Sequence, residues 1–163
     1  MEICFSPWAK WASRNNLTNE DDSGVYLIAR FDQEPHSGPG SPFEKSIVYI
    51  GESSGGRLRG RWRSFERSAF KSKGRHRGGK RYRELFGGTS SVLYVSVLSG
   101  KGLIKAFLGF ERCPFLDISC SSAKAETDNL LHEIDDLLMK YVERRLILLY
   151  SLAHGHRPAC NAD

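Results

Sequence analysis

Apolar residues gather into five segments of the chain, and their spacing differs between those segments. Three short runs rich in β-branched and aromatic residues are typical of strands: 24–31 (GVYLIARF), 47–51 (IVYIG) and 91–98 (SVLYVSVL). Two longer segments show the spacing of amphipathic helices, 58–70 (LRGRWRSFERSAF) and 123–152. The predicted element order is therefore β-β-α-β-α.

The polar segments between these elements predict loops and one short extension. Residues 32–45 contain three prolines and two glycines, which predicts a long loop. Residues 71–88 are rich in glycine and basic residues and are expected to form a basic loop. The first 22 residues are expected to form an N-terminal helical extension, with a short helix over 7–16. Residues 101–122 show neither the spacing of a helix nor the alternation of a strand and receive no assignment.

Length and composition indicate one globular domain covering residues 1–163. With 40% hydrophobic and 26% charged residues, a chain of 163 residues is long enough for one core and too short for two. The expected fold is of the α/β (α+β) class. It consists of a small central, mainly antiparallel sheet of about three strands, flanked by helices.

The sequence indicates neither a leader nor a membrane span. Its start lacks a charged region followed by an apolar one, and no apolar run approaches the roughly 18 residues that a span requires. We therefore expect a cytoplasmic protein without a membrane partner. The four cysteines have no C-x-x-C spacing, which predicts free thiols and no zinc knuckle.

The positive charge is concentrated in one segment. The chain carries a net charge of +5, but residues 57–83 hold twelve Lys or Arg against one acid, Glu66. Their net +11 leaves −6 for the rest of the chain. Such a block indicates a polyanionic partner, and the guanidinium fork suits phosphate. A solvated basic helix with a floppy tail is the alternative, whereas the glycines of 71–80 disfavour a membrane-surface helix.

The arginines of the helix predicted over 58–70 differ in their angular position relative to its apolar face. At 100° per residue, its apolar stripe consists of Leu58, Trp62, Phe65 and Ala69. Arg61 lies about 70° from the centre of this stripe, at the border of the buried face, where packing can fix its stem. Arg57 at the helix start is the next candidate. The arginines that point further away are Arg59, Arg63 and Arg67. A fixed arginine suits the stabilisation of a phosphate in a transition state.

Five motifs, in this order, resemble the GIY-YIG endonuclease family. They are GVY at 24–26, YIG at 49–51, LRGR at 58–61, Glu143-Arg-Arg-Leu146-Ile147, and Arg157-Pro158-Ala-Cys160-Asn161. The resemblance spans residues 24–161, nearly the whole chain. The long interval between GVY and YIG resembles the restriction enzymes of the family more than its repair enzymes.

This resemblance implies an active site, a cofactor and a partner. The implied catalytic residues are Tyr26, Tyr49, Arg61, Glu143 and Asn161. One of the two tyrosines would help to deprotonate the attacking water, Glu143 would bind Mg²⁺ or Mn²⁺, and Asn161 would orient its neighbours. The residues expected to contact the DNA backbone are Arg57, Arg59, Arg63, Lys71, Lys73, Arg75, Arg77, Lys80 and Arg81.

The residues around Glu143 independently indicate an unusual carboxylate. Its helical neighbours at i+3, i+4 and i+7 are the apolar Leu146, Ile147 and Tyr150. A carboxylate among apolar side chains must be paired, protonated or metal-bound. An ion pair with Lys140 is the simple alternative. One carboxylate together with water and phosphate oxygens is sufficient for Mg²⁺.

Two positions depart from the family pattern. Glu52 follows YIG, where relatives often carry a basic residue, and Phe65 stands one turn after Arg61, where relatives often carry His or Tyr. A phenyl ring cannot transfer a proton. If such a helper is needed, Lys73, His76 or a tyrosine must supply it, and the sequence does not choose among them.

The expected function is a metal-dependent endonuclease that hydrolyses phosphodiester bonds of DNA, most simply double-stranded DNA, as a restriction or defence enzyme. Two alternatives stay open. One is a catalytically weak nucleic-acid-binding module of the same fold, and the other is a structure-specific, repair-type nickase. A restriction enzyme that reads a palindrome would also imply a homodimer.

Overall fold

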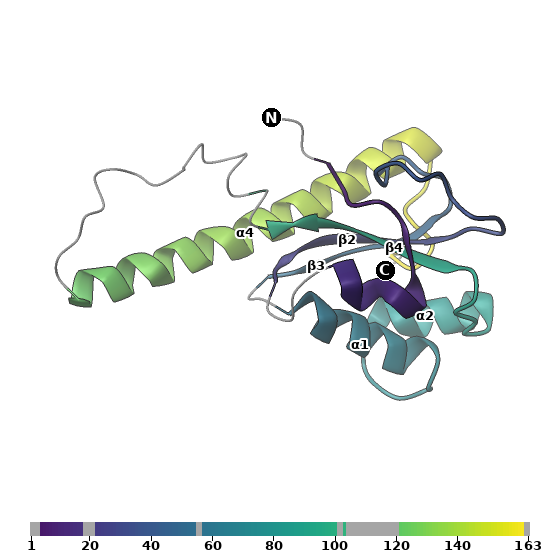
Figure 1. Cartoon of the computed structure of the whole chain (residues 1–163), viewed down its shortest axis with the longest axis horizontal. Helices are drawn as coiled ribbons and strands as arrows, with labels where there is room; N and C mark the ends of the chain where they lie inside the picture. The colour runs from purple at the N-terminus through teal and green to yellow at the C-terminus, as the bar shows by residue number, and fades with distance from the viewer. Residues whose placement is uncertain (1–3, 18–21, 55–56, 101–102, 104–120, 162–163) are drawn as a thin grey trace.

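Figure 1 shows the computed structural model, which describes residues 4–17, 22–54, 57–100, 103 and 121–161. Its centre is a four-stranded antiparallel sheet in the order β1-β4-β2-β3. The strands are β1 (Ala9–Lys10), β2 (Gly24–Arg30), β3 (Ile47–Ser53) and β4 (Leu93–Ser99). The described helices are the 3₁₀ helix η1 (Trp11–Leu17), α1 (Leu58–Ala69), α2 (Arg77–Phe86) and α4 (Ser121–His154). The predicted α+β class with an antiparallel sheet is confirmed.

Helices cover both faces of the sheet, with α1, α2 and η1 on one face and α4 on the other (Figure 1). The central strand β2 contributes to both cores. Tyr26 and Ile28 pack under α1, and the alternating residues Val25, Leu27 and Ala29 pack under α4. All five side chains are buried, which explains why β2 reads as a continuous apolar run.

Helix α1 buries the stripe that its sequence predicts. Leu58, Trp62, Phe65 and Ala69 have no exposed surface. The 3₁₀ helix η1 packs beside them, since the Trp11 ring lies 5.4 Å from that of Phe65 and Arg14 forms an ion pair with Glu66. Packing therefore fixes the helix on which Arg61 stands.

Part of the expected basic loop is instead helix α2, so the prediction of a loop over 71–88 is wrong for Arg77–Phe86. The His76 ring caps the helix by accepting the Gly79 N–H at 3.1 Å. A Cβ on Gly79 would lie 2.7 Å from the Phe65 carbonyl oxygen, so glycine permits the close approach of α1 and α2. Tyr82 is buried, and Gly87 ends the helix with a φ of 67°. Tertiary packing thus outweighs the low helix propensity of the glycines.

The N-terminal segment also differs from the prediction. A helix was expected over 7–16, but this segment contains β1 followed by η1. The sheet therefore has four strands where about three were expected. Because Trp11 belongs to the main core, this segment completes the sheet and its packing. Residues 101–102 and 104–120, which received no assignment, lie outside the described residues.

Strand β3 is irregular and its outer edge is covered. Ile28 pairs with Tyr49 but Ala29 pairs with Ile47, so Val48 is an extra residue in a bulge. The C-terminal segment lies along this edge, where the Cys160 N–H donates to the Val48 carbonyl at 2.8 Å. The segment thereby protects an edge strand that would otherwise expose unpaired backbone groups.

None of the described helices is both long and apolar enough to cross a membrane.

Candidate active site

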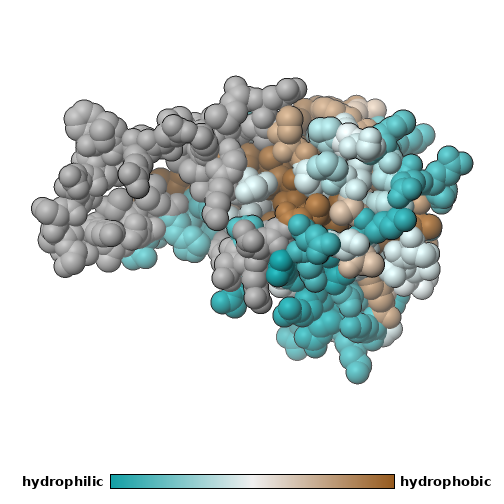
Figure 2. All heavy atoms as spheres, viewed as in Figure 1, coloured by the Kyte–Doolittle hydropathy of each residue, from teal (hydrophilic) through white to brown (hydrophobic). Residues whose placement is uncertain are grey.

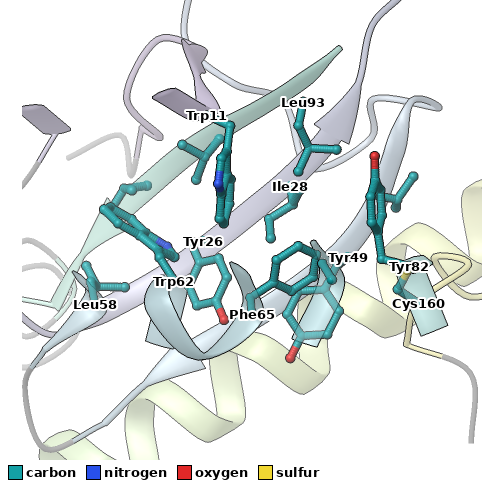
Figure 3. Packing of buried hydrophobic residues seen from close by; sticks show 14 residues of the cluster. Trp11, Tyr26, Ile28, Tyr49, Leu58, Trp62, Phe65, Tyr82, Leu93 and Cys160 are labelled. Atoms are coloured by element: carbon teal, nitrogen blue, oxygen red, sulfur yellow. The ribbon is translucent and has the colours of Figure 1, made fainter. Parts of the chain in front are cut away.

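Two tyrosines from neighbouring strands meet over a glycine. Tyr26 pairs with Gly51 across β2 and β3, and the rings of Tyr26 and Tyr49 lie 6.0 Å apart. A Cβ on Gly51 would lie 2.6 Å from Tyr49 Cε1 and 2.7 Å from the Tyr26 hydroxyl oxygen. Only a glycine at this position leaves room for both rings. Figure 3 shows their hydroxyl groups projecting from the same side of the aromatic cluster, away from Trp11.

Both phenols are shifted toward their protonated form. Burial, with the neighbouring Tyr49 as the next cause, holds the pKa of Tyr26 well above its usual value. Burial and then the charge of Glu143 raise the pKa of Tyr49 to about 12. The Tyr26 hydroxyl is buried and has no hydrogen-bond partner of good geometry among the described residues. Both groups are therefore neutral hydrogen-bond donors at neutral pH unless positive charge is added nearby.

Arg61 brings a fixed positive charge to these tyrosines. Its Nε donates to the Glu52 carbonyl oxygen at 3.2 Å, which ties α1 to the end of β3. Burial lowers the pKa of Arg61, but the neighbouring Tyr26, Tyr49 and Glu52 outweigh that effect, and its pKa is raised. The guanidinium therefore remains charged beside both hydroxyl groups.

Glu143 stands on α4, which covers the opposite face of the sheet, and its charge contributes to the raised pKa of Tyr49. Burial first, and the charge of Glu52 second, raise its pKa to about 7, whereas Arg61 lowers it. Among the described residues, its carboxyl forms neither an ion pair nor a hydrogen bond, so the suggested pair with Lys140 is absent from this part of the structure. Glu143 is thus a half-buried carboxyl that has no partner in the described part of the chain and lies near a second acid.

The donor set suits a hard cation that keeps part of its hydration shell. Among the described residues, no group of three or more His, Cys, Asp or Glu side chains could hold a metal ion. Glu52 is nevertheless close enough for its charge to contribute to the raised pKa of Glu143. One or two carboxylates completed by water and phosphate oxygens suit Mg²⁺, whereas a structural zinc site needs four protein ligands. A bound cation would also relieve the cost of ionising Glu143.

His76 is the group that lies against Tyr49. Its ring centroid lies 5.4 Å from that of Tyr49 and 5.4 Å from that of Phe65. Because Nδ1 accepts the Gly79 N–H, the proton of the neutral ring is on Nε2, which is buried without a partner among the described residues. Burial, and then the charge of Arg61, lower its pKa to about 4. Lys73, another helper that the sequence leaves open, is exposed.

Asn161 is brought to the strand that carries Tyr49, where its amide acts as a clamp. Its Oδ1 accepts the Ile50 N–H at 2.7 Å and its Nδ2 donates to the Ile50 carbonyl at 2.8 Å. Ile50 lies between Tyr49 and Gly51 in the sequence. Asn161 therefore positions the backbone under the two tyrosine rings through the strand edge.

The basic residues form a mostly exposed surface over α1, α2 and the segment between them. Figure 2 shows hydrophilic side chains gathered on the part of the molecule where Figure 1 places these helices. Some residues of the predicted set contact other residues of the chain. Arg59 donates to the Asn15 carbonyl at 2.7 Å, Lys71 lies 3.0 Å from Glu66, and Arg81 lies 3.5 Å from Glu84. The other members are exposed: Arg57, Arg63, Lys73, Arg75, Arg77 and Lys80.

The chain matches no protein-family model, no curated protein and no solved structure closely enough to show a relationship.

The structure thus brings together four of the five predicted catalytic residues, Tyr26, Tyr49, Arg61 and Glu143, and connects Asn161 to them through β3. The sequence marks Glu52 only as a departure from the family pattern. Its position next to Gly51 is the signal that could have marked it as a second carboxylate of the site.

Proposed function

We propose that this protein is a metal-dependent endonuclease of the GIY-YIG type that hydrolyses phosphodiester bonds of DNA. One observation carries the proposal. Two buried tyrosines, a fixed arginine and an unpaired carboxyl converge from β2, β3, α1 and α4, next to an exposed basic surface. Phosphoryl transfer needs mainly positioning and electrostatic stabilisation, which such a set can provide.

Arg61 is suited to the phosphate oxygens. Its bond to the Glu52 carbonyl orients the guanidinium before substrate arrives, so little reorganisation is required when charge develops. The basic residues expected to contact the DNA backbone, a set that does not include Arg67, would bind the flanking phosphates and supply most of the salt-dependent affinity.

Tyr49 is the better candidate to contact the attacking water, because Tyr26 has no exposed surface and Tyr49 retains a little. With a pKa of about 12, the Tyr49 hydroxyl would orient this water as a neutral phenol unless cations lower its pKa. A divalent cation held by Glu143, with Glu52 nearby, would supply that charge and stabilise the leaving 3′ oxygen. His76, with its pKa of about 4, is a poor proton donor at pH 7 and would serve to position Tyr49.

A nucleic-acid-binding module with weak catalysis is the second candidate. It is favoured by Phe65, which stands fully buried one turn after Arg61 and cannot transfer a proton. Both candidates would lose affinity for DNA as salt rises, because both bind through the same basic surface. Dependence on a divalent cation distinguishes them.

The test is conversion of supercoiled plasmid with and without Mg²⁺ or Mn²⁺, alongside a binding titration of the same DNA. We expect cation-dependent cleavage that Arg61→Ala reduces by about 10²-fold or more, whereas Arg67→Ala, an exposed arginine of the same helix, changes it little. Discrete fragments would indicate sequence-specific cutting, and nicked circles a structure-specific nickase. Salt-sensitive binding without cleavage under any of these conditions would favour the binding module.

A further inference from the structure

Helix α4 carries a second apolar face that nothing in the described structure covers. Of the large hydrophobic residues that are exposed among the described residues, all but Phe43 and Leu85 stand on this helix. These are Leu130 (54% exposed), Ile134 (43%), Leu137 (67%), Tyr141 (50%), Leu148 (57%) and Leu152 (73%). We call them the α4 stripe.

The stripe lies opposite the face that packs on the sheet. At 100° per residue, its six members fall within an arc of about 60°. The side chains that α4 buries against the sheet, among them Met139, Val142 and Tyr150, lie about 110° to 190° from its middle. A surface helix normally has one apolar face. The first four residues of the stripe are also separated by four, three and four positions, which is the spacing of the contact residues between two paired helices.

The stripe is large enough for a small interface. Its six side chains, each about half exposed, present roughly 600 Å², at the upper limit of the largest apolar patch on a typical monomer. The first four, from Leu130 to Tyr141, present roughly 400 Å², and the stems of flanking charged residues add to this area. A standard interface buries about 800 Å² per partner, so pairing over these four residues would give a weak, reversible dimer. The N-terminal part of α4 also extends beyond the sheet (Figure 1).

We propose that a second copy of this chain packs on the α4 stripe, with the two α4 helices antiparallel over Leu130–Tyr141. The charges at the edge of the stripe favour this arrangement. Glu133 and Lys140 stand two turns apart on the same edge, so that antiparallel pairing about the midpoint of this segment places each Glu133 opposite the partner's Lys140. Leu130 then meets the partner's Tyr141, and Ile134 meets the partner's Leu137.

A parallel pair of α4 helices is disfavoured by the positive charges beside the stripe. Arg144 lies close to the line of the stripe, between Tyr141 and Leu148, and would face its own copy in a parallel pair. Lys140 would then face the partner's Arg145, a second like-charge contact. Like charges facing each other across such an interface select against it. The dimer rests on the surface of α4 and does not depend on the proposed nuclease activity.

Sedimentation velocity of the full chain over about 1–200 µM tests the proposal. We expect a reversible dimer whose dissociation constant rises at least tenfold in Leu137→Ser, while Leu85→Ser, an exposed leucine of α2, leaves it unchanged. Circular dichroism of both variants checks that the helices are retained. A wild-type protein that stays monomeric over this range, or equal effects of the two substitutions, would overturn the proposal.

Charge reversal tests the antiparallel register independently of folding. Glu133→Lys and Lys140→Glu are each expected to weaken the dimer about tenfold, because each places like charges together twice. The double variant Glu133→Lys/Lys140→Glu restores the opposite pairs and is expected to recover the wild-type constant. A double variant no better than either single change would contradict this register.

Discussion

Replacing Gly51 with alanine should displace the tyrosine pair without removing any polar group of the site. The new methyl group would lie 2.6 Å from Tyr49 Cε1 and 2.7 Å from the Tyr26 hydroxyl oxygen. Real side chains do not approach this closely, and both rings are held in the core, so one or both must shift. Overpacking of this kind costs about 1–3 kcal/mol, and we expect the free energy of unfolding to fall by about 2 kcal/mol. In a chain of this length, that loss lowers Tm by about 4–8 °C.

Gly60→Ala is the matched control, since it makes the same chemical change on the adjacent helix α1. Its Cβ would lie 3.4 Å from Arg57 Cβ, an ordinary contact, and alanine favours helix by about 0.5–1 kcal/mol over glycine. Urea denaturation followed by tryptophan fluorescence should therefore give shifts of opposite sign for the two variants. A displacement of 1 Å at a reacting group can cost about 10²-fold in rate, so cleavage should also fall at least tenfold in Gly51→Ala. If Gly51→Ala were as stable and as active as Gly60→Ala, the placement of the two rings over Gly51 would be refuted.

Three further outcomes follow from single contacts of the site. The raised pKa of Glu143, about 7, means that the folded protein binds a proton at this carboxyl more tightly than the unfolded chain does. The free energy of unfolding of the metal-free protein should therefore fall as pH rises from about 4.5 to 7. Thermal unfolding in EDTA measures this fall, and Glu143→Gln should remove it. Asn161→Ala removes two hydrogen bonds to Ile50 and should cost about 2 kcal/mol in urea denaturation, whereas a loss below 0.5 kcal/mol would argue against the clamp. His76→Ala removes the cap of α2 and should cost about 1 kcal/mol, and His76→Asn, which keeps a capping oxygen, should recover most of the stability but not the packing against Tyr49.

The parts of the fold that the sequence predicts correctly are those where local pattern and tertiary packing agree. The apolar runs of β2 and β3 and the stripe of α1 appear in the structure close to their expected bounds. Helix α2 escapes prediction because its two glycines and its charges oppose a helix locally. Its stability comes from the approach of Gly79 to α1 and from the burial of Tyr82, which no local pattern reveals. Strand β1 has only two residues, too few for a period to be detected.

The residues of the candidate site also differ in how far the sequence alone predicts them. Tyr26, Tyr49, Arg61 and Glu143 could be singled out because each stands in a motif or at a recognisable position on a helix face. The contact of His76 with Tyr49 depends on the path of the chain between α1 and α2. The clamp of Asn161 on Ile50 joins residues more than a hundred positions apart, and only the three-dimensional structure reveals it.

The most direct test of the proposed nuclease is the single-turnover rate of cleavage of a labelled DNA duplex at saturating Mg²⁺. Glu143→Gln is compared with Glu84→Gln, which alters an exposed carboxylate of α2. We expect cation-dependent cleavage by the wild type and by Glu84→Gln, and a rate at least about 10²-fold lower in Glu143→Gln. Equal rates in the two variants, or cleavage that persists in EDTA, would contradict the assignment of Glu143 as the residue that holds the cation.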